Sequence, residues 1–246
     1  MKIVIISISV FILSSGCNKD QRTNQNAETK KDTATKTKQN MQATINTAST
    51  MQKADSSDKS GIENLTYDTG RLPDGIKYSG KIVGSARWND KNGENIVIIT
   101  ETPVKEQSGD FKMKELFGYH YTINSGDTKL LWKINDFIKD CPVDITLRYI
   151  DNSLSITDLD NNGIAESSFL YRMSCKGDVS PDDMKLLMHE GENKYAIRGQ
   201  MKLTIKGEGT YGGEIKIDPS FDKAPREFID YAKDQWNKYR EEKVGY

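Results

Sequence analysis

The sequence has few of the residues on which catalytic and nucleic-acid-binding sites commonly depend. Its 246 residues include only two histidines and three cysteines. It contains no Gly-rich phosphate loop, no G-x-S-x-G nucleophile elbow and no H-E-x-x-H zinc motif. With 35 basic and 36 acidic side chains, its formal net charge is −1, whereas nucleic-acid-binding domains present a clustered basic surface. We therefore expect no nucleic-acid partner, and no common enzyme class is indicated.

Long hydrophobic runs are also scarce. The apolar fraction is 35%, below the roughly 45–50% of typical globular chains counted with glycine. The one apolar run, residues 3–13, is shorter than the roughly 20 residues of a membrane-spanning helix. It follows Lys2 and precedes Ser14-Ser15-Gly16-Cys17, an order typical of a secretory signal.

The cysteine that follows Gly16 makes residues 1–17 resemble a bacterial lipoprotein signal. In that family the cysteine becomes the lipidated N-terminus, so the resemblance implies lipidation of Cys17 and attachment to the outer membrane of a bacterial cell envelope. Ser14 stands where the motif usually has Leu, and looser motifs of this kind occur in Bacteroidetes-type bacteria. The alternative is a secretory signal that is cut elsewhere. Acyl chains contribute about 0.8 kcal/mol per buried CH₂, enough to anchor a protein that does not cross the bilayer.

Residues 18–60 contain no aromatic residue, no proline and no glycine. A segment with so little apolar surface cannot offset the entropy of ordering its backbone, so we expect a disordered tether. A flexible chain of this length has a typical end-to-end distance of about 35 Å. The tether would hold a folded body, residues 61–246, away from the lipid surface.

Apart from Cys17, the chain has Cys141 and Cys175. An exported protein lies in an oxidising compartment, so a Cys141–Cys175 disulfide is expected, two buried free thiols being the alternative.

Most of residues 61–217 alternate with period two, which is typical of strands. In Phe117-Gly118-Tyr119-His120-Tyr121-Thr122-Ile123, four apolar side chains share one face and His120 lies on the other. Turn signals at 89–93, 124–127 and 151–153 separate short segments, and Asn-Gly is a strong hairpin signal. Two more hairpins are expected, one joining 185–190 to 194–198 and one joining 201–206 to 213–217. The pattern predicts a mainly-β, antiparallel domain, either propeller-fragment or sandwich-like.

The C-terminal region changes period. Phe228, Ile229, Ala232, Trp236 and Tyr239 recur at helical spacing, which predicts an amphipathic helix over about residues 222–243. Its polar side has mixed charge, which favours packing on the sheet, with membrane-surface binding as the alternative. Upstream, Ser180-Pro181-Asp182-Asp183 has the composition of a helix start and predicts a single helical turn.

The segment Asp158-Leu159-Asp160-Asn161-Asn162-Gly163-Ile164-Ala165-Glu166 carries the clearest chemical pattern. Ca²⁺ takes six to eight oxygen ligands, and glycine at the sixth loop position allows a sharp turn around the ion. The segment resembles the D-x-D-x-D-G-x-x-D loops of FG-GAP and VCBS-like repeats, which join two β-strands. That resemblance implies a structural calcium site with side chains of Asp158, Asp160, Asn162 and Glu166 and the carbonyl of Ile164 as ligands. An Asx-rich turn that binds nothing is the alternative.

No catalytic group stands out. We interpret His120 and His189 as surface or packing residues, and no pair of acids is set apart by its spacing. The stretches 156–172, 175–181, 188–191 and 195–199 resemble an uncharacterised family of Bacteroidetes lipoproteins, some labelled surface polysaccharide biosynthesis proteins. This resemblance implies an envelope-anchored, non-enzymatic domain that supports surface polysaccharide assembly or binding, with surface glycan or envelope proteins as partners. A carbohydrate-active enzyme of unrecognised type and a protein-binding adhesin or inhibitor are the alternatives.

Overall fold

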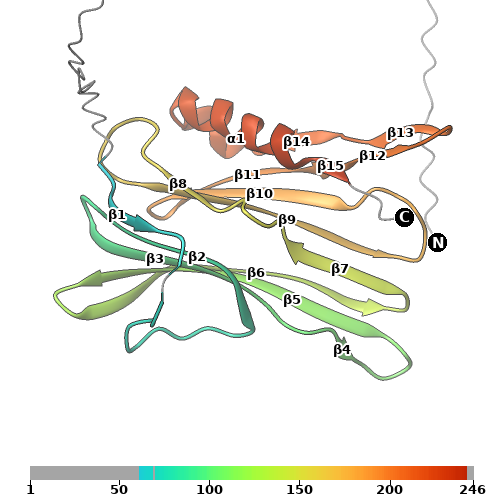
Figure 1. The fold of residues 1–246 in the computed structure, drawn as a ribbon, viewed down its shortest axis with the longest axis horizontal. Helices are drawn as coiled ribbons and strands as arrows, with labels where there is room; N and C mark the ends of the chain where they lie inside the picture. Colours follow the sequence, from blue (N-terminus) through green and yellow to red (C-terminus); the bar gives the residue numbers. More distant parts are fainter. Residues whose placement is uncertain (1–60, 69, 243–246) are drawn as a thin grey trace, which may run out of the picture. The chain divides into compact units, whose positions relative to one another are not determined.

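A computed structural model describes residues 61–68 and 70–242 of the chain. The expected signal sequence, Cys17 and the expected tether lie outside these described residues. Figure 1 shows two sheets lying one above the other, with helix α1 on the outer face of the upper sheet. This arrangement confirms the mainly-β fold with a C-terminal helix, in its sandwich-like form. Within the described residues, no helix combines the length and the apolar character that crossing a bilayer requires.

The first sheet has the order β1-β2-β3-β5-β4, and β6 pairs with β5 on a separate path. All its pairings are antiparallel. Its strands are β1 (Glu63–Thr66), β2 (Lys81–Asp90), β3 (Gly93–Glu101), β4 (Lys105–Glu106), β5 (Lys112–Asn124) and β6 (Asp127–Cys141). The turns at Asn89–Gly93 and Asn124–Asp127 are thus confirmed as the β2–β3 and β5–β6 hairpins.

The second sheet has the order β14-β11-β10-β9-β7, with β8 pairing with β9. Its strands are β7 (Asp144–Tyr149), β8 (Ser155–Thr157), β9 (Glu166–Lys176), β10 (Asp183–Glu190), β11 (Asn193–Gln200) and β14 (Ile215–Ile217). A small third sheet holds β12 (Lys202–Ile205) between β13 (Gly209–Gly212) and β15 (Glu241–Glu242). The β10–β11 hairpin is confirmed.

The main core lies between the two larger sheets. Side chains from both sheets form it, among them Trp88, Val97, Ile99, Leu116, Trp132, Leu147, Phe169 and Leu187. On β5, Phe117, Tyr119 and Tyr121 belong instead to a smaller cluster with Ile76. The hydroxyls of Tyr121 and Tyr119 accept hydrogen bonds from the backbone N–H groups of Lys77 and Ser79. The segment before β2 therefore packs against these tyrosines.

The Cys141–Cys175 disulfide is present. Cys141 ends β6 in the first sheet and Cys175 lies in β9 of the second. The bridge therefore joins the two layers covalently.

Helix α1 spans Arg226–Tyr239, after the 3₁₀ helix η1 (Pro219–Lys223). It is shorter than the expected 222–243 because Pro225 is its N-cap residue and the chain pairs as β15 from Glu241. Phe228, Ala232 and Trp236 pack against the outer face of the second sheet. This confirms packing on the sheet for the helix's apolar stripe.

The expected hairpin between 201–206 and 213–217 is wrong. β12 pairs with β13, and β14 pairs with β11. Gly212 and Gly213 have φ angles of +70° and +88°, a region that glycine enters without steric cost. They turn the chain away from β12, and the carbonyl of Glu214 accepts a hydrogen bond from Gln200 N–H.

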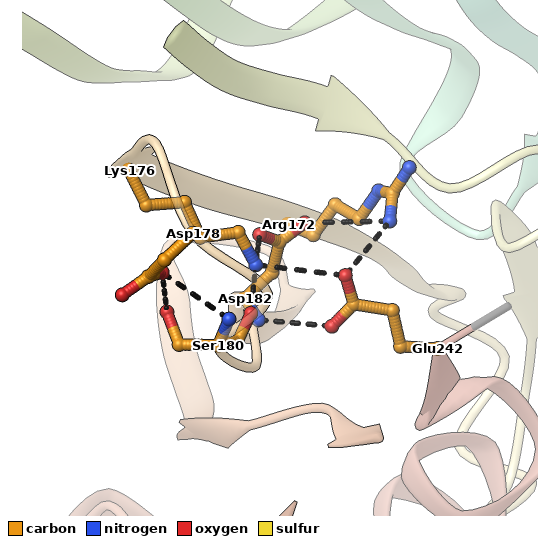
Figure 2. A network of polar contacts seen from close by, with 6 residues as sticks. All are labelled: Arg172, Lys176, Asp178, Ser180, Asp182 and Glu242. Atoms are coloured by element: carbon orange, nitrogen blue, oxygen red, sulfur yellow. Dashed lines mark hydrogen bonds and ion pairs between the residues drawn. The ribbon is translucent and has the colours of Figure 1, made fainter. Parts of the chain in front are cut away.

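The helical turn expected at Ser180–Asp183 is also absent, because tertiary contacts hold this segment in another conformation. Asp182 is 1% exposed; its carboxylate oxygens lie 3.3 Å from Arg172 Nη1 and 2.6 Å from Lys176 Nζ. Asp182 N–H donates to Glu242 (3.0 Å), as Figure 2 shows. Ser180 N–H and its hydroxyl both donate to Asp178. The network thereby ties β9, the start of β10 and β15 together.

Candidate metal centre

The predicted calcium loop joins β8 to β9, as expected for a loop between two strands. Asp158, Asp160 and Glu166 each bring one carboxylate oxygen to a common place, where these atoms lie within 4.8 Å of one another. The structure thus brings together three of the five predicted ligand residues through their side chains. We call these three side chains the carboxylate cluster.

Glu166 is the buried member of the carboxylate cluster. Its Oε2 accepts hydrogen bonds from the hydroxyl of Thr157 (2.9 Å) and from Leu159 N–H (3.0 Å). Its Oε1 is buried and has no hydrogen-bond partner. Burial raises the pKa of Glu166 to about 7, and the neighbouring charge of Asp160 adds to the rise, while the two hydrogen bonds oppose it. A buried carboxylate oxygen without a donor is costly, and a bound cation would remove that cost.

The first half of the loop is held by its own backbone. Asp158 accepts a hydrogen bond from Gly163 N–H (3.2 Å to Oδ2), and Gly163 has a φ of +83°. Glycine at the sixth position is therefore used for the sharp turn that the sequence predicts. Asp160 accepts from Asn162 N–H at 3.2 Å.

Asn162 and Ile164 are occupied differently from the three acids. The Oδ1 of Asn162 accepts a hydrogen bond from Ile164 N–H at 2.7 Å. The amide of Asn162 donates to Asp160 (3.1 Å) and to Glu190 (2.7 Å). In this arrangement the Asn162 side chain braces the loop against β10, and its role as a ligand stays a prediction, as does that of the Ile164 carbonyl.

Two segments far away in sequence hold the loop from outside. Gly61 N–H donates to the Oδ2 of Asp158 at 3.0 Å. At the β2–β3 turn, Lys91 N–H donates to the carbonyl of Gly163 at 2.8 Å. Asp90 accepts from Ala165 N–H at 3.1 Å. Sequence reasoning identified the turn at 89–93 but not its contact with the loop, because contacts between distant segments leave no local pattern.

The carboxylate cluster has the chemistry of a hard-cation site. Carboxylate oxygens are the ligands that Ca²⁺ prefers, and three like charges so close together repel unless a cation or a proton offsets them. The three converging carboxylates and the unpartnered, buried Oε1 of Glu166 fit the chemistry of such an ion. Asp158, Asp160 and Glu166 would hold it.

Both histidines lie between the sheets. The His120 ring lies 5.2 Å from the Trp88 ring and 5.5 Å from the Trp132 ring, and Trp132 stacks on His189. Burial lowers the pKa of His120 to about 4 and that of His189 to about 3; Lys194 adds to the lowering at His189, whereas Asp90 opposes it at His120. The Nε2 of His120 lies 2.9 Å from Asn95 Oδ1. These surroundings make both imidazoles neutral packing groups.

The chain matches no known protein family model, and no curated protein or solved structure shows significant similarity to it.

Proposed function

We propose that the protein is a lipid-anchored component of the bacterial outer membrane whose β-sandwich binds one structural Ca²⁺. In this proposal the sandwich supports the assembly or binding of surface polysaccharide without catalysing a reaction. Its partners are the lipid bilayer, through an acylated Cys17, and surface glycan or envelope proteins. The observation that carries the calcium site is the convergence of Asp158, Asp160 and Glu166 within 4.8 Å.

The surroundings of the carboxylate cluster support a structural role for the ion. Hydrogen bonds connect the loop to Gly61, where the described domain begins, and to the β2–β3 turn at Lys91. An ion held by Asp158, Asp160 and Glu166 would offset their mutual repulsion. It would therefore stabilise the junction between the two sheets at this end of the sandwich.

The burial of Glu166 supports binding over catalysis. A glycosidase requires two acids about 5–10 Å apart, one of which has a raised pKa. Burial raises the pKa of Glu166 to about 7, but Glu166 is 0% exposed, which leaves a sugar no access to its carboxyl group. Its place in the predicted calcium loop gives that shift a structural explanation.

Thermal unfolding in Ca²⁺ and in chelator tests the site. Ligand binding to the folded state alone stabilises by RT ln(1 + [L]/Kd), about 2.7 kcal/mol when the free ion is at 100 times its Kd. We expect calcium to raise the melting temperature of the wild type but to have little effect on Asp160→Asn. Glu208→Gln makes the same charge change at an exposed site in the β12–β13 turn, and it should respond as the wild type does. Equal melting temperatures with and without calcium in the wild type would refute the site.

The envelope role is tested separately in cells. Deletion of the gene should reduce or alter the surface polysaccharide, seen by typing the extracted glycan. Restoring the wild-type gene should restore the original pattern, and a deletion strain with unchanged polysaccharide would contradict this role.

A further inference from the structure

A groove of about 740 Å³ runs along one side of α1. It is lined by Val83–Ser85 of β2 and by Tyr231, Gln235 and Lys238, which follow one another on one face of α1. The β7–β8 turn at Asp151–Asn152 also lines it. The volume lies within the range of roughly 300–1,000 Å³ typical of small-ligand sites. We call this feature the α1 groove.

Three tyrosines line the α1 groove, and each is held through its hydroxyl. Tyr67 accepts a hydrogen bond from Ile156 N–H (3.3 Å), and Tyr149 accepts one from Leu154 N–H (2.9 Å). Tyr231 donates to the hydroxyl of Ser155 at 2.7 Å. Rings anchored at their polar ends are fixed in orientation, so the groove is formed before any ligand arrives.

Tyr67 is the exposed ring of the three. It remains 53% exposed although its hydroxyl is bonded to the backbone of β8. A fixed, solvent-facing tyrosine offers a large amphipathic contact surface at small entropic cost. Tyr149, in contrast, is buried; a Cβ atom at Gly84 would lie only 3.1 Å from its Cζ. Tyr149 therefore forms the floor of the groove.

The polar groups around these rings can both donate and accept. The described residues contain no hydrogen-bond or ion-pair partner for the side chains of Asp151, Asn152 and Gln235, and the Lys238 ammonium lies 4.9 Å from the centre of the Tyr239 ring. Amides supply donors and acceptors, a carboxylate supplies acceptors, and an ammonium supplies donors. One positive and one negative charge give the lining no single sign.

We propose that the α1 groove binds a short oligosaccharide, with Tyr67 as the stacking platform and Asp151, Asn152, Gln235 and Lys238 as hydrogen-bonding groups. A sugar ring has an apolar face of C–H groups and an edge of hydroxyls that donate and accept, which matches this lining. A peptide strand added to β2 would need pockets for alternate apolar side chains, whereas most of the groove is polar or aromatic. The choice of ligand class rests on the proposed role in surface polysaccharide, and the α1 groove is the surface that would carry that role.

Nuclear magnetic resonance of the ¹⁵N-labelled full chain tests the inference with defined probes. The methyl glycosides of glucose, N-acetylglucosamine and glucuronic acid are each added to about 50 mM, which detects millimolar dissociation constants. We expect at least one sugar to shift amide signals of Tyr67, Asp151, Asn152 and Gln235. A peptide of alternating Val and Thr is the comparison; shifts from the peptide and none from the sugars would overturn the proposal.

Three variants locate the binding surface. Tyr67→Ala should weaken binding of the sugar about three- to tenfold, from the value of one aromatic contact. Tyr211→Ala, which removes an exposed tyrosine of β13, should bind as the wild type does. Gln235→Ala should also weaken binding and serves if Tyr67→Ala does not fold. The proposal would be overturned if none of the three sugars shifted the groove signals. It would also be overturned if Tyr67→Ala and Gln235→Ala both bound the sugar with wild-type affinity.

The melting temperature with and without calcium distinguishes a failure of sugar binding in the α1 groove from a failure of the proposed metal site. Tyr67→Ala should keep the full calcium-dependent rise in melting temperature, because Tyr67 is not part of the carboxylate cluster. Absence of sugar binding would therefore say nothing against the calcium site. Absence of calcium binding would likewise say nothing against sugar binding in the α1 groove.

Discussion

The indole of Trp132 stacks on the imidazole of His189, with ring centroids 4.1 Å apart and planes inclined by 17°. Trp132 comes from β6 in the first sheet and His189 from β10 in the second, so the stack crosses the interface between the layers. His120 meets the same indole edge-on. Both imidazoles of the chain are thus part of the main core, where their protonation opposes folding.

We expect acid to destabilise the fold through these two histidines. Their pKa values are about 4 and about 3 in the folded state, against about 6.5 for an unperturbed histidine. Below pH 6.5 the unfolded chain binds protons that the folded chain does not, so stability is lost as pH falls from about 6.5 toward 4. At about 1.36 kcal/mol per pKa unit, His120 alone accounts for up to roughly 3 kcal/mol. Urea unfolding at a series of pH values measures this loss.

His189→Phe keeps an aromatic ring against Trp132 and removes one titrating group, so its stability should fall less steeply between pH 6.5 and 4. Glu166 has the opposite effect on the pH dependence. Its pKa is raised from 4.5 to about 7 in the folded state. Its contribution to the free energy of unfolding is therefore fully present below about pH 4.5 and is lost as pH rises through 7. The comparison is therefore made between wild type and variant in chelator. Parallel curves for the two proteins would contradict a role for His189.

Loss of the Cys141–Cys175 bridge should lower the free energy of unfolding by about 3–4 kcal/mol, the chain-entropy value for a loop of this length. The double variant Cys141→Ser, Cys175→Ser tests this in urea unfolding. Cys17→Ser leaves the bridge intact and is the matched control. A double variant with the unfolding midpoint of the wild type would show that the bridge contributes nothing.

Gly61→Ala should destabilise the domain and weaken calcium binding. A Cβ atom at this position would lie 2.5 Å from the Cα of Gly163 and 2.8 Å from Asp158 Oδ2, so the loop has to move. Overpacking of this kind costs about 1–3 kcal/mol. Gly177→Ala is the control, because its Cβ would meet nothing closer than 3.6 Å. Melting curves and calcium titrations that match for the two variants would disprove the contact's importance.

Cys17→Ser should release the protein from the membrane fraction, because serine lacks the sulfur to which the lipid would be attached. Cell fractionation followed by immunoblotting measures the distribution, and metabolic labelling with palmitate should mark the wild type alone. Membrane association that survives the substitution would mean that another part of the chain provides the anchor.

Several features could be predicted from the sequence because the signals are local. The strand at Phe117–Ile123 follows from alternation within a few residues, and the helix follows from the spacing of Phe228, Ala232 and Trp236. The turn of the 158–166 loop follows from glycine at position 163. In each case neighbouring residues determine the backbone conformation, so no knowledge of distant contacts is needed.

Other features were decided by tertiary structure. Ser180–Asp183 has the composition of a helix start, yet ion pairs of Asp182 with Arg172 and Lys176 hold it in another conformation. The pairing of β14 with β11 likewise depends on competition between strand edges.

Local patterns were enough to predict the strand at 117–123, the C-terminal helix and the turn of the 158–166 loop, because backbone preference and apolar spacing act over a few residues. Only the folded chain decided that His120 faces the main core, that β12 pairs with β13, and that Tyr67, Tyr149 and Tyr231 line one groove. These outcomes depend on contacts between segments that are distant in sequence. The free energies of those contacts cannot be judged from any one segment alone.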